Sequence, residues 1–145
     1  MIGLLQRVTR AGVDIEGETV ARIETGLLVL VAVNPEDTPA AAQRLAERLL
    51  TYRVFPDPNG RMNLALADTG GGLLLVPQFT LAARTDKGTR ASFTSAAPPD
   101  QARALFETLV TAARGRHADV QAGRFGADMA VSLTNDGPVT FWLET

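Results

Sequence analysis

Two short segments, far apart along the chain, contain the residues best suited to chemistry. The first is Pro77–Leu81, directly after an apolar run at 73–76, and the second is Asn135–Thr140, near the end of the chain. Each follows a strand-like run and offers backbone N–H and C=O groups in place of reactive side chains. Neither contains His, Cys or a carboxylate in a usual catalytic role. If these segments catalyse a reaction, the main chain must do much of the work by orienting a substrate and stabilising charge.

The side chains in the sequence exclude several common mechanisms. There is no Cys, hence no disulfide and no thiolate nucleophile. The one histidine, His117, lies in a polar stretch, and we interpret it as an exposed loop residue. A Ser-His-Asp triad would need this histidine beside a nucleophile, and the Gly-x-Ser-x-Gly motif is absent. A zinc site would need more His or Cys ligands, so we expect neither a metal nor a cofactor.

Hydroxyl and carboxylate groups give weaker alternatives. The candidate nucleophiles are Thr80, Ser92, Thr134 and Thr140. A threonine without a neighbouring base is a poor nucleophile, and in strands it is commonly just a good β-forming residue. The aspartates that could form a magnesium or acid–base site are Asp68, Asp86, Asp128 and Asp136. Because their spacing does not require such a site, structural roles are the simpler interpretation.

The composition is that of one compact domain, which we expect to span residues 1–145. Of the 145 residues, 46% are hydrophobic and 21% are charged, which is enough for a core and ordinary for a globular protein. The net charge of −2 argues against a large nonspecific nucleic-acid surface, so DNA is not an expected partner. A signal-peptide pattern is absent, and the longest apolar run, 27–33, is too short to cross a bilayer. We therefore expect a cytoplasmic protein without a membrane partner.

Helical periodicity predicts two main helices. Thr38 and Pro39 have the N-cap and first-turn pattern of a helix start, and the apolar positions that follow lie on one face. A second helix is predicted from Pro98–Asp100 to Gly115. Its apolar positions are Ala102, Leu105, Phe106, Leu109, Val110 and Ala113.

The other apolar runs predict strands, and the polar stretch 82–97 predicts a long loop of the kind that is often functional. The strands are expected at 1–16, 19–23, 27–33, 53–55, 62–66, 73–81, 120–125, 129–133 and 139–143. The helices separate groups of strands and do not alternate regularly with them. This order favours an α/β fold class with a mixed sheet and helices on one side over a doubly wound nucleotide-binding fold.

Motifs along nearly the whole chain resemble those of the D-aminoacyl-tRNA deacylase family, proofreading enzymes that remove D-amino acids from tRNA. The matching motifs are Gln6–Val8, Gly26–Leu30, Gly60–Asn63, Gln78–Leu81, Ala96–Pro99, Gly123–Met129 and Asn135–Thr140. Each motif alone is weak evidence for the family, whereas all of them in this order, over a chain of the expected length, are a specific match. The resemblance implies a three-layer α/β fold with a barrel-like core, a homodimer, and hydrolysis of the ester that joins an amino acid to the 3′-terminal adenosine of tRNA.

The resemblance also implies a catalytic segment. Gln78, Phe79 and Thr80 would line the pocket beneath the ester, directly after Pro77. Met129 is expected near this pocket or at the subunit interface, with plain packing in the core as the alternative. A backbone N–H of Phe79 or Thr80 is the candidate oxyanion donor. A ribose hydroxyl of the substrate would assist the reaction, so Thr80 is expected to shape the pocket and not to act as a nucleophile.

Gly137 and Pro138 are the expected chiral selector, together with Asn135 and Val139. From the residues alone, Asp136–Gly137 beside a strand also fits a hairpin turn. The resemblance instead implies a cis Gly-Pro peptide that reaches into the pocket of the other subunit, where its carbonyl oxygens would receive the α-ammonium group. An L side chain would then meet main chain, whereas a D side chain would not. Glycine has no side chain to reject, so glycine attached to alanine tRNA is an expected substrate too.

Two positions depart from the family pattern. Pro77 stands where the family commonly has Ser, and a related deacylase family with relaxed chiral selection has Pro there but Ala in place of Phe79. Because this chain keeps Phe79, we expect D-specificity. Ala91 stands where Pro is usual in the long loop. In the same loop, Lys87 and Arg90 are candidate tRNA contacts, with plain solvation as the alternative.

Two other classes of function stay open from the residues alone. One is a noncatalytic dimer that binds an RNA end or a small ligand with the same pocket. The other is a structural dimerisation module.

Overall fold

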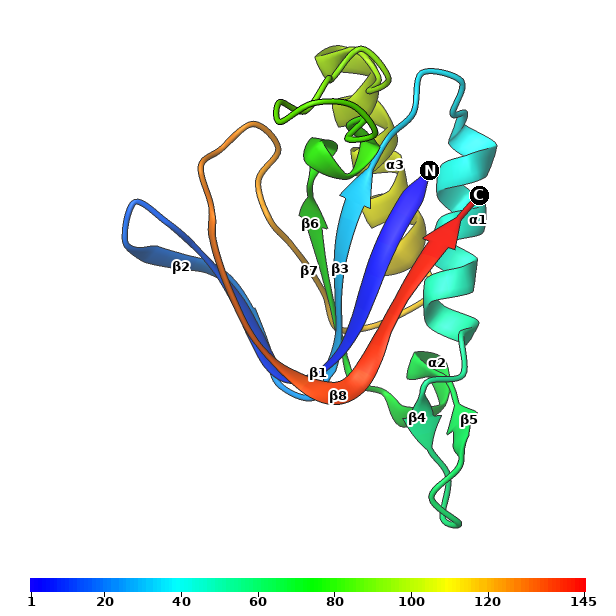
Figure 1. Ribbon diagram of the computed structural model, residues 1–145. Coiled ribbons are helices and arrows are strands. Elements are labelled where there is room, and N and C mark those ends of the chain that lie inside the picture. The colour runs from blue at the N-terminus through cyan, green and yellow to red at the C-terminus, as the bar shows by residue number, and fades with distance from the viewer.

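The computed structural model describes all residues from 1 to 145 as a strongly bent sheet with helices on one side (Figure 1). The strands are β1 (Ile2–Ile15), β2 (Glu18–Ile23), β3 (Gly26–Ala32), β4 (Phe55–Pro56), β5 (Met62–Leu64), β6 (Gly72–Pro77), β7 (Val120–Ala122) and β8 (Ala130–Glu144). The helices are α1 (Pro39–Thr51), α2 (Leu66–Thr69) and α3 (Pro99–Arg114), and the 3₁₀ turn η1 covers Phe79–Ala82.

The long strand β1 organises the main sheet. The sheet order is β2-β1-β3-β6-β7, and β8 lies along the other side of β1. β1 is antiparallel to β2, β3 and β8, whereas β3, β6 and β7 are mutually parallel. β1 and β8 bend together in the lower middle of Figure 1, above the level of β4 and β5, so that their far halves, with β2, leave the plane of the other strands. The barrel-like mixed sheet expected from the sequence is thereby confirmed.

Two apolar cores separate three layers. The first lies between the sheet and helices α1 and α3, and its fully buried members include Leu5, Leu73, Leu45 and Leu109. The second core lies between β3 and β6 and the curled part of the sheet, and it contains Val8, Val13, Ala21, Leu28 and Val76. No polar or charged residue is buried. The α/β prediction with two main helices is confirmed, because α1 and α3 are the only long helices.

The start of α1 follows from the local sequence. The Thr38 hydroxyl oxygen accepts a hydrogen bond from the Ala41 N–H at 3.4 Å, and Pro39 occupies the first turn. Both features are typical of a helix start because the first N–H groups have no partner within the helix. None of the helices is long and apolar enough to span a membrane.

Three local predictions are corrected by the structure. The strands expected at 129–133 and 139–143 form one strand, β8, because both halves pair with the continuous partner β1. The strand expected at 62–66 ends at Leu64, and α2 follows, closed by Gly70 in the left-handed conformation with φ 68°. The strand expected at 73–81 ends at Pro77, and the chain then turns into η1.

Candidate active site

A cavity of about 470 Å³ lies at the carboxyl end of β6. In α/β sheets, ligands commonly bind at this end of the parallel strands. Three segments form the walls: residues 76–79 at the end of β6, the start of α3 with Pro99 and Ala102, and residues 125–129 between β7 and β8. The end of β6 and η1 lie in the upper part of Figure 1. The predicted residues Pro77, Gln78 and Phe79 therefore share one cavity with Met129, while Thr80 lies just outside its lining.

The turn after β6 leaves two main-chain donors beside the cavity. The Gln78 N–H donates to the Val31 carbonyl at 2.7 Å, which extends the pairing with β3 beyond Pro77. The first hydrogen bond of η1 then runs from the Leu81 N–H to the Gln78 carbonyl at 3.2 Å. The N–H groups of Phe79 and Thr80 precede this bond and have no acceptor within the turn. This arrangement offers adjacent donors for a developing negative charge.

The side chains of this segment do not form a nucleophile–base pair. The Gln78 side-chain amide donates to the Thr80 hydroxyl oxygen at 2.5 Å. An amide cannot accept the hydroxyl proton as a base would, so Thr80 lacks the activation that a nucleophilic threonine needs. No group of three or more His, Cys, Asp or Glu side chains is arranged to hold a metal ion.

The wall formed by residues 125–129 carries apolar side chains. Met129 reaches the cavity past Gly123, where a Cβ atom would lie 2.8 Å from the methionine sulfur. Phe125 packs near Phe106, with 6.5 Å between ring centroids, and the Arg103 guanidinium lies 5.0 Å from its ring centre. Sequence reasoning did not assign Phe125 to the site, although the motif Gly123–Met129 contained the signal.

The segment around Gly137 forms an exposed bulge in β8. Val8 of β1 lies opposite Asn135 and Gln6 lies opposite Thr140, so residues 136–139 have too few partners. The Asn135 amide closes the bulge by donating to the carbonyls of Arg7 at 2.9 Å and Val139 at 3.0 Å. The peptide bond before Pro138 is cis. The sequence-based hairpin turn is thus not formed.

An arginine under the bulge contacts it directly. The Arg7 Nε lies 2.9 Å from Asp136 Oδ2, as an ion pair whose orientation does not form a hydrogen bond. Gly137 and Pro138 are exposed and do not line the cavity of their own subunit. The Val139 side chain is buried in the helix-side core, which leaves only its main chain to contact a ligand.

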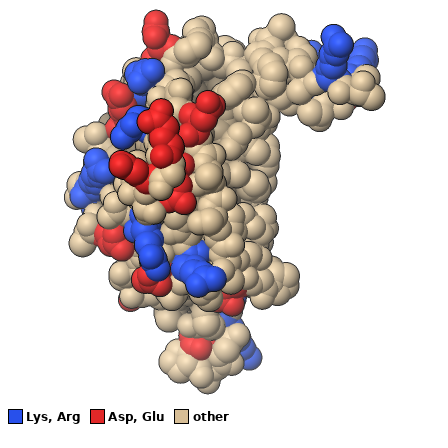
Figure 2. Space-filling model, turned by 90° about the vertical axis from the view of Figure 1, so that its left-hand side faces the viewer, with Lys and Arg blue, Asp and Glu red and all other residues tan.

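The two predicted tRNA contacts lie in the loop after η1. Lys87 and Arg90 line a small hollow of about 250 Å³ with Arg84, Asp86 and Ser92. Figure 2 shows this loop as the projection at the upper right, with its Lys and Arg side chains grouped at the tip.

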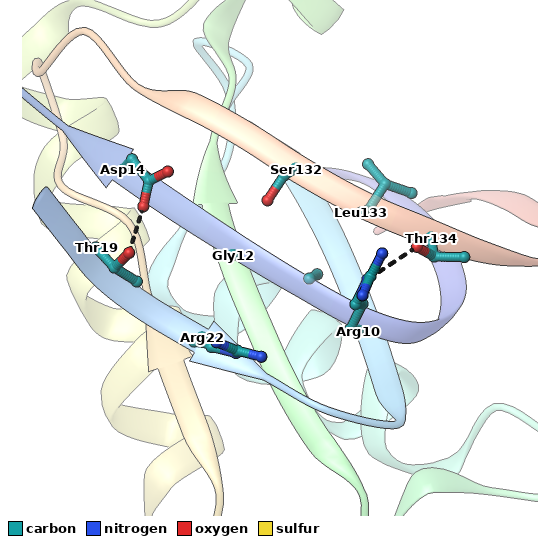
Figure 3. A pocket seen from close by; sticks show the side chains of 9 residues that line it. Arg10, Gly12, Asp14, Thr19, Arg22, Ser132, Leu133 and Thr134 are labelled. Atoms are coloured by element: carbon teal, nitrogen blue, oxygen red, sulfur yellow. Dashed lines mark hydrogen bonds between the residues drawn. The ribbon is translucent and has the colours of Figure 1, made fainter. Parts of the chain in front are cut away.

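A second sizeable hollow, of about 350 Å³, lies on the layer formed by β1, β2 and β8 (Figure 3). Its polar groups are largely occupied by one another. The Thr19 hydroxyl donates to Asp14 at 2.6 Å, and the Arg10 Nε donates to the Thr134 hydroxyl at 3.3 Å. Arg22 lies 3.3 Å from Glu24 outside the hollow. Because these polar side chains mostly bond to one another, this hollow is the weaker candidate for an active site.

Comparisons with known proteins agree with the motif pattern. A family model described as D-Tyr-tRNA(Tyr) deacylase matches residues 4–144. The D-aminoacyl-tRNA deacylase of Thioalkalivibrio sulfidiphilus is 64% identical over 99% of this chain and 97% of its own length. That of Pseudomonas fluorescens is 60% identical over 100% of both chains.

Solved structures show the same architecture. A protein described as c-Myc DNA Unwinding Element Binding Protein has a TM-score of 0.95 and 35% identity, covering 100% of this chain and 99% of that chain. A probable eukaryotic D-amino acid tRNA deacylase, at 18% identity, has the same fold with a TM-score of 0.85, covering 99% of this chain and 98% of that chain. The chain therefore belongs to the D-Tyr-tRNA(Tyr) deacylase family, which confirms the assignment made from the sequence motifs and the expectation of an enzyme.

Proposed function

We propose that this chain hydrolyses the ester bond of D-aminoacyl-tRNA and releases the free amino acid and tRNA. Family membership over residues 4–144 supports this activity, and the cavity beside the free N–H groups of Phe79 and Thr80 supports the site. The reaction would take place in the cytoplasm, where aminoacyl-tRNA is used. The partners are the 3′-terminal adenosine of the tRNA and a second copy of the chain.

In the proposed mechanism, Gln78, Phe79 and Thr80 supply orientation and charge stabilisation. The N–H of Phe79 or Thr80 donates to the carbonyl oxygen of the ester as it becomes negative in the tetrahedral transition state. The neighbouring ribose hydroxyl of the substrate helps to activate the attacking water, so the protein need not provide a base. Pro77 and Met129 line the cavity that would hold the terminal nucleoside.

Chiral selection is proposed to come from the main chain of Gly137 and Pro138 in the partner subunit. These residues are exposed and lie outside the cavity of their own subunit. We therefore propose that they contact a substrate bound in the cavity of a second copy. Their carbonyl oxygens would accept hydrogen bonds from the α-ammonium group, and an L side chain would then clash with main chain. The Asn135 amide stiffens this selector through its two hydrogen bonds.

The activity is tested with tyrosyl-tRNA of both chiralities in the presence of a chelator. We expect rapid release of D-tyrosine and release of L-tyrosine close to the uncatalysed rate, because only the L side chain meets the selector. Glycine attached to alanine tRNA should also be hydrolysed, since it has no side chain to reject. Tight binding of D-tyrosyl-tRNA without turnover would instead favour a noncatalytic binder of RNA ends.

Thr80→Ala should keep most of the activity, with a decrease of no more than about tenfold. The substitution removes the hydrogen bond from the Gln78 amide, and such a bond contributes about 1 kcal/mol. The measurement is single-turnover hydrolysis of D-tyrosyl-tRNA, with Thr80→Ser as the matched variant that keeps the hydroxyl. A loss of roughly four orders of magnitude, as on removal of a true nucleophile, would assign the reaction to the hydroxyl group.

A further inference from the structure

The loop between η1 and α3 carries more positive charge than its neighbours can balance. Its basic side chains, Arg84, Lys87 and Arg90, are all exposed around one hollow. Arg84 lies 3.6 Å from Asp86, whereas Lys87 and Arg90 have no carboxylate within ion-pair distance. In a chain with a net charge of −2, this loop forms a small, local patch of positive charge.

Two aromatic rings lie together beside this basic loop. Phe79 and Phe93 have ring centroids 5.1 Å apart, and they are 55% and 46% exposed. Phe79 also lines the active-site cavity, so the pair continues from the cavity onto the loop. Exposed aromatic faces next to cations are the usual elements of a surface that binds single-stranded nucleic acid, because any base can stack on them.

The loop is held in place and can therefore present this surface. Arg84 and Ser92 exchange two backbone hydrogen bonds of 2.9 and 3.0 Å, which close a short antiparallel bridge across the loop. The Ser95 hydroxyl donates to the Ala82 carbonyl at 2.6 Å, which fixes the base of the loop beside η1. These hydrogen bonds fix the positions of Phe93, at the base of the loop, and of the cations at its tip. The cations then lie farther from the cavity than Phe93.

We propose that this surface binds the single-stranded 3′ end of the tRNA upstream of its terminal nucleotide. One upstream base stacks on Phe93, which is itself supported by Phe79, and the backbone phosphates contact Lys87 and Arg90. This inference rests on the proposed function, because the cavity must hold the terminal nucleoside for the upstream nucleotides to reach the loop. It adds Phe93 as a residue that binds RNA and not the amino acid.

The test compares D-tyrosyl-tRNA with D-tyrosyl-adenosine, which lacks every upstream nucleotide. For Phe93→Ala, the ratio of kcat/KM for the tRNA to kcat/KM for the adenosine ester should fall roughly 5- to 150-fold, the range expected for loss of one stacked base. Phe93→Tyr keeps an aromatic face and should restore the ratio, whereas Phe93→Leu should not. For Arg90→Ala, the slope of log KM for tRNA against log salt should decrease by about 0.7 for each phosphate that the arginine no longer neutralises.

Arg61→Ala is the matched charge control. Arg61 is exposed in the β4–β5 hairpin, at the opposite end of the molecule from the loop, so its loss should leave both substrates unchanged (Figure 1). An equal loss on both substrates for Phe93→Ala would overturn the proposal by making Phe93 a support of the cavity. A ratio of kcat/KM values that Phe93→Ala leaves unchanged would also overturn the proposal. So would a change of oligomeric state in Phe93→Ala, because the aromatic pair would then be a contact between copies.

Binding of uncharged tRNA separates this inference from the proposed reaction. The Phe93→Ala and Arg90→Ala variants should bind uncharged tRNA more weakly than the unmodified chain, and Arg61→Ala should not. If the unmodified chain hydrolyses neither ester, the proposed function fails, while the binding measurement still decides on the RNA surface. If all variants bind uncharged tRNA equally well, the proposal that this surface binds RNA is wrong, whatever the hydrolysis result.

Discussion

A D-aminoacyl-tRNA whose terminal adenosine lacks the 2′-hydroxyl should be hydrolysed roughly 10²–10⁴ times more slowly than the normal substrate, the usual contribution of a positioned general acid or base. The reason is the composition of the site. Thr80 accepts a hydrogen bond from an amide and has no base beside it, and the one histidine, His117, is engaged with the Gly71 carbonyl at 2.6 Å, away from the cavity. The substrate is then the remaining source of a hydroxyl group next to the ester.

Two measurements make this result specific. The uncatalysed hydrolysis of each substrate is measured in parallel, because removal of the hydroxyl also changes the intrinsic reactivity of the ester. The deoxy substrate should still inhibit hydrolysis of the normal one at similar concentrations, which shows that it occupies the site. An enzyme-specific rate that is the same for both substrates would mean that a group of the protein activates the water.

Gly26→Ala should destabilise the fold by more than about 4 kcal/mol, a loss that few single substitutions cause. A Cβ atom at position 26 would lie 1.9 Å from the Gly72 carbonyl oxygen and 2.7 Å from the Gly72 nitrogen. Both are main-chain atoms, so no side chain can rotate away, and β3 and β6 must separate at this point. The expected result is a large decrease in the midpoint of chemical denaturation, or failure to obtain folded protein.

Gly12→Ala is the matched control for this substitution. It also adds one methyl group to a strand glycine, but the nearest atoms would be 3.5 and 3.6 Å away, which is ordinary contact. It should change the stability by less than about 1 kcal/mol. The same β3–β6 ladder ends with Val31 opposite Pro77, so a partly folded Gly26→Ala protein should also lose activity. Equal stability of the two variants would show that the glycine contact is not needed.

Local patterns in the sequence were enough to predict the helices and most strands. The helix starting at Thr38 and the buried run at 27–33 depend on neighbours along the chain, and both were found where expected. Local patterns could not predict that β8 is one continuous strand. Residues 135–138 carry strong turn signals, and only pairing with β1, more than a hundred residues away, keeps the strand continuous.

Only part of the candidate site could be predicted, for a similar reason. Pro77, Gln78 and Phe79 are adjacent in sequence, and so their grouping in the cavity followed from one motif. Phe125 and Ala102 join them only because β7 and α3 pack against β6, which is a property of the tertiary fold. The aromatic partnership of Phe79 with Phe93 likewise depends on how the long loop folds back.

The pairing of β1 with β8 also affects how the chain can fold during synthesis. Ile2 lies opposite Glu144, so almost the first and the last residues of the fold are neighbours in one ladder. Native contacts between such distant residues give a high contact order, which is associated with folding in milliseconds to seconds instead of microseconds. The ribosome must therefore deliver the final strand before the sheet can close, and until then the outer side of β1 is an unpaired edge that is open to pairing with another chain.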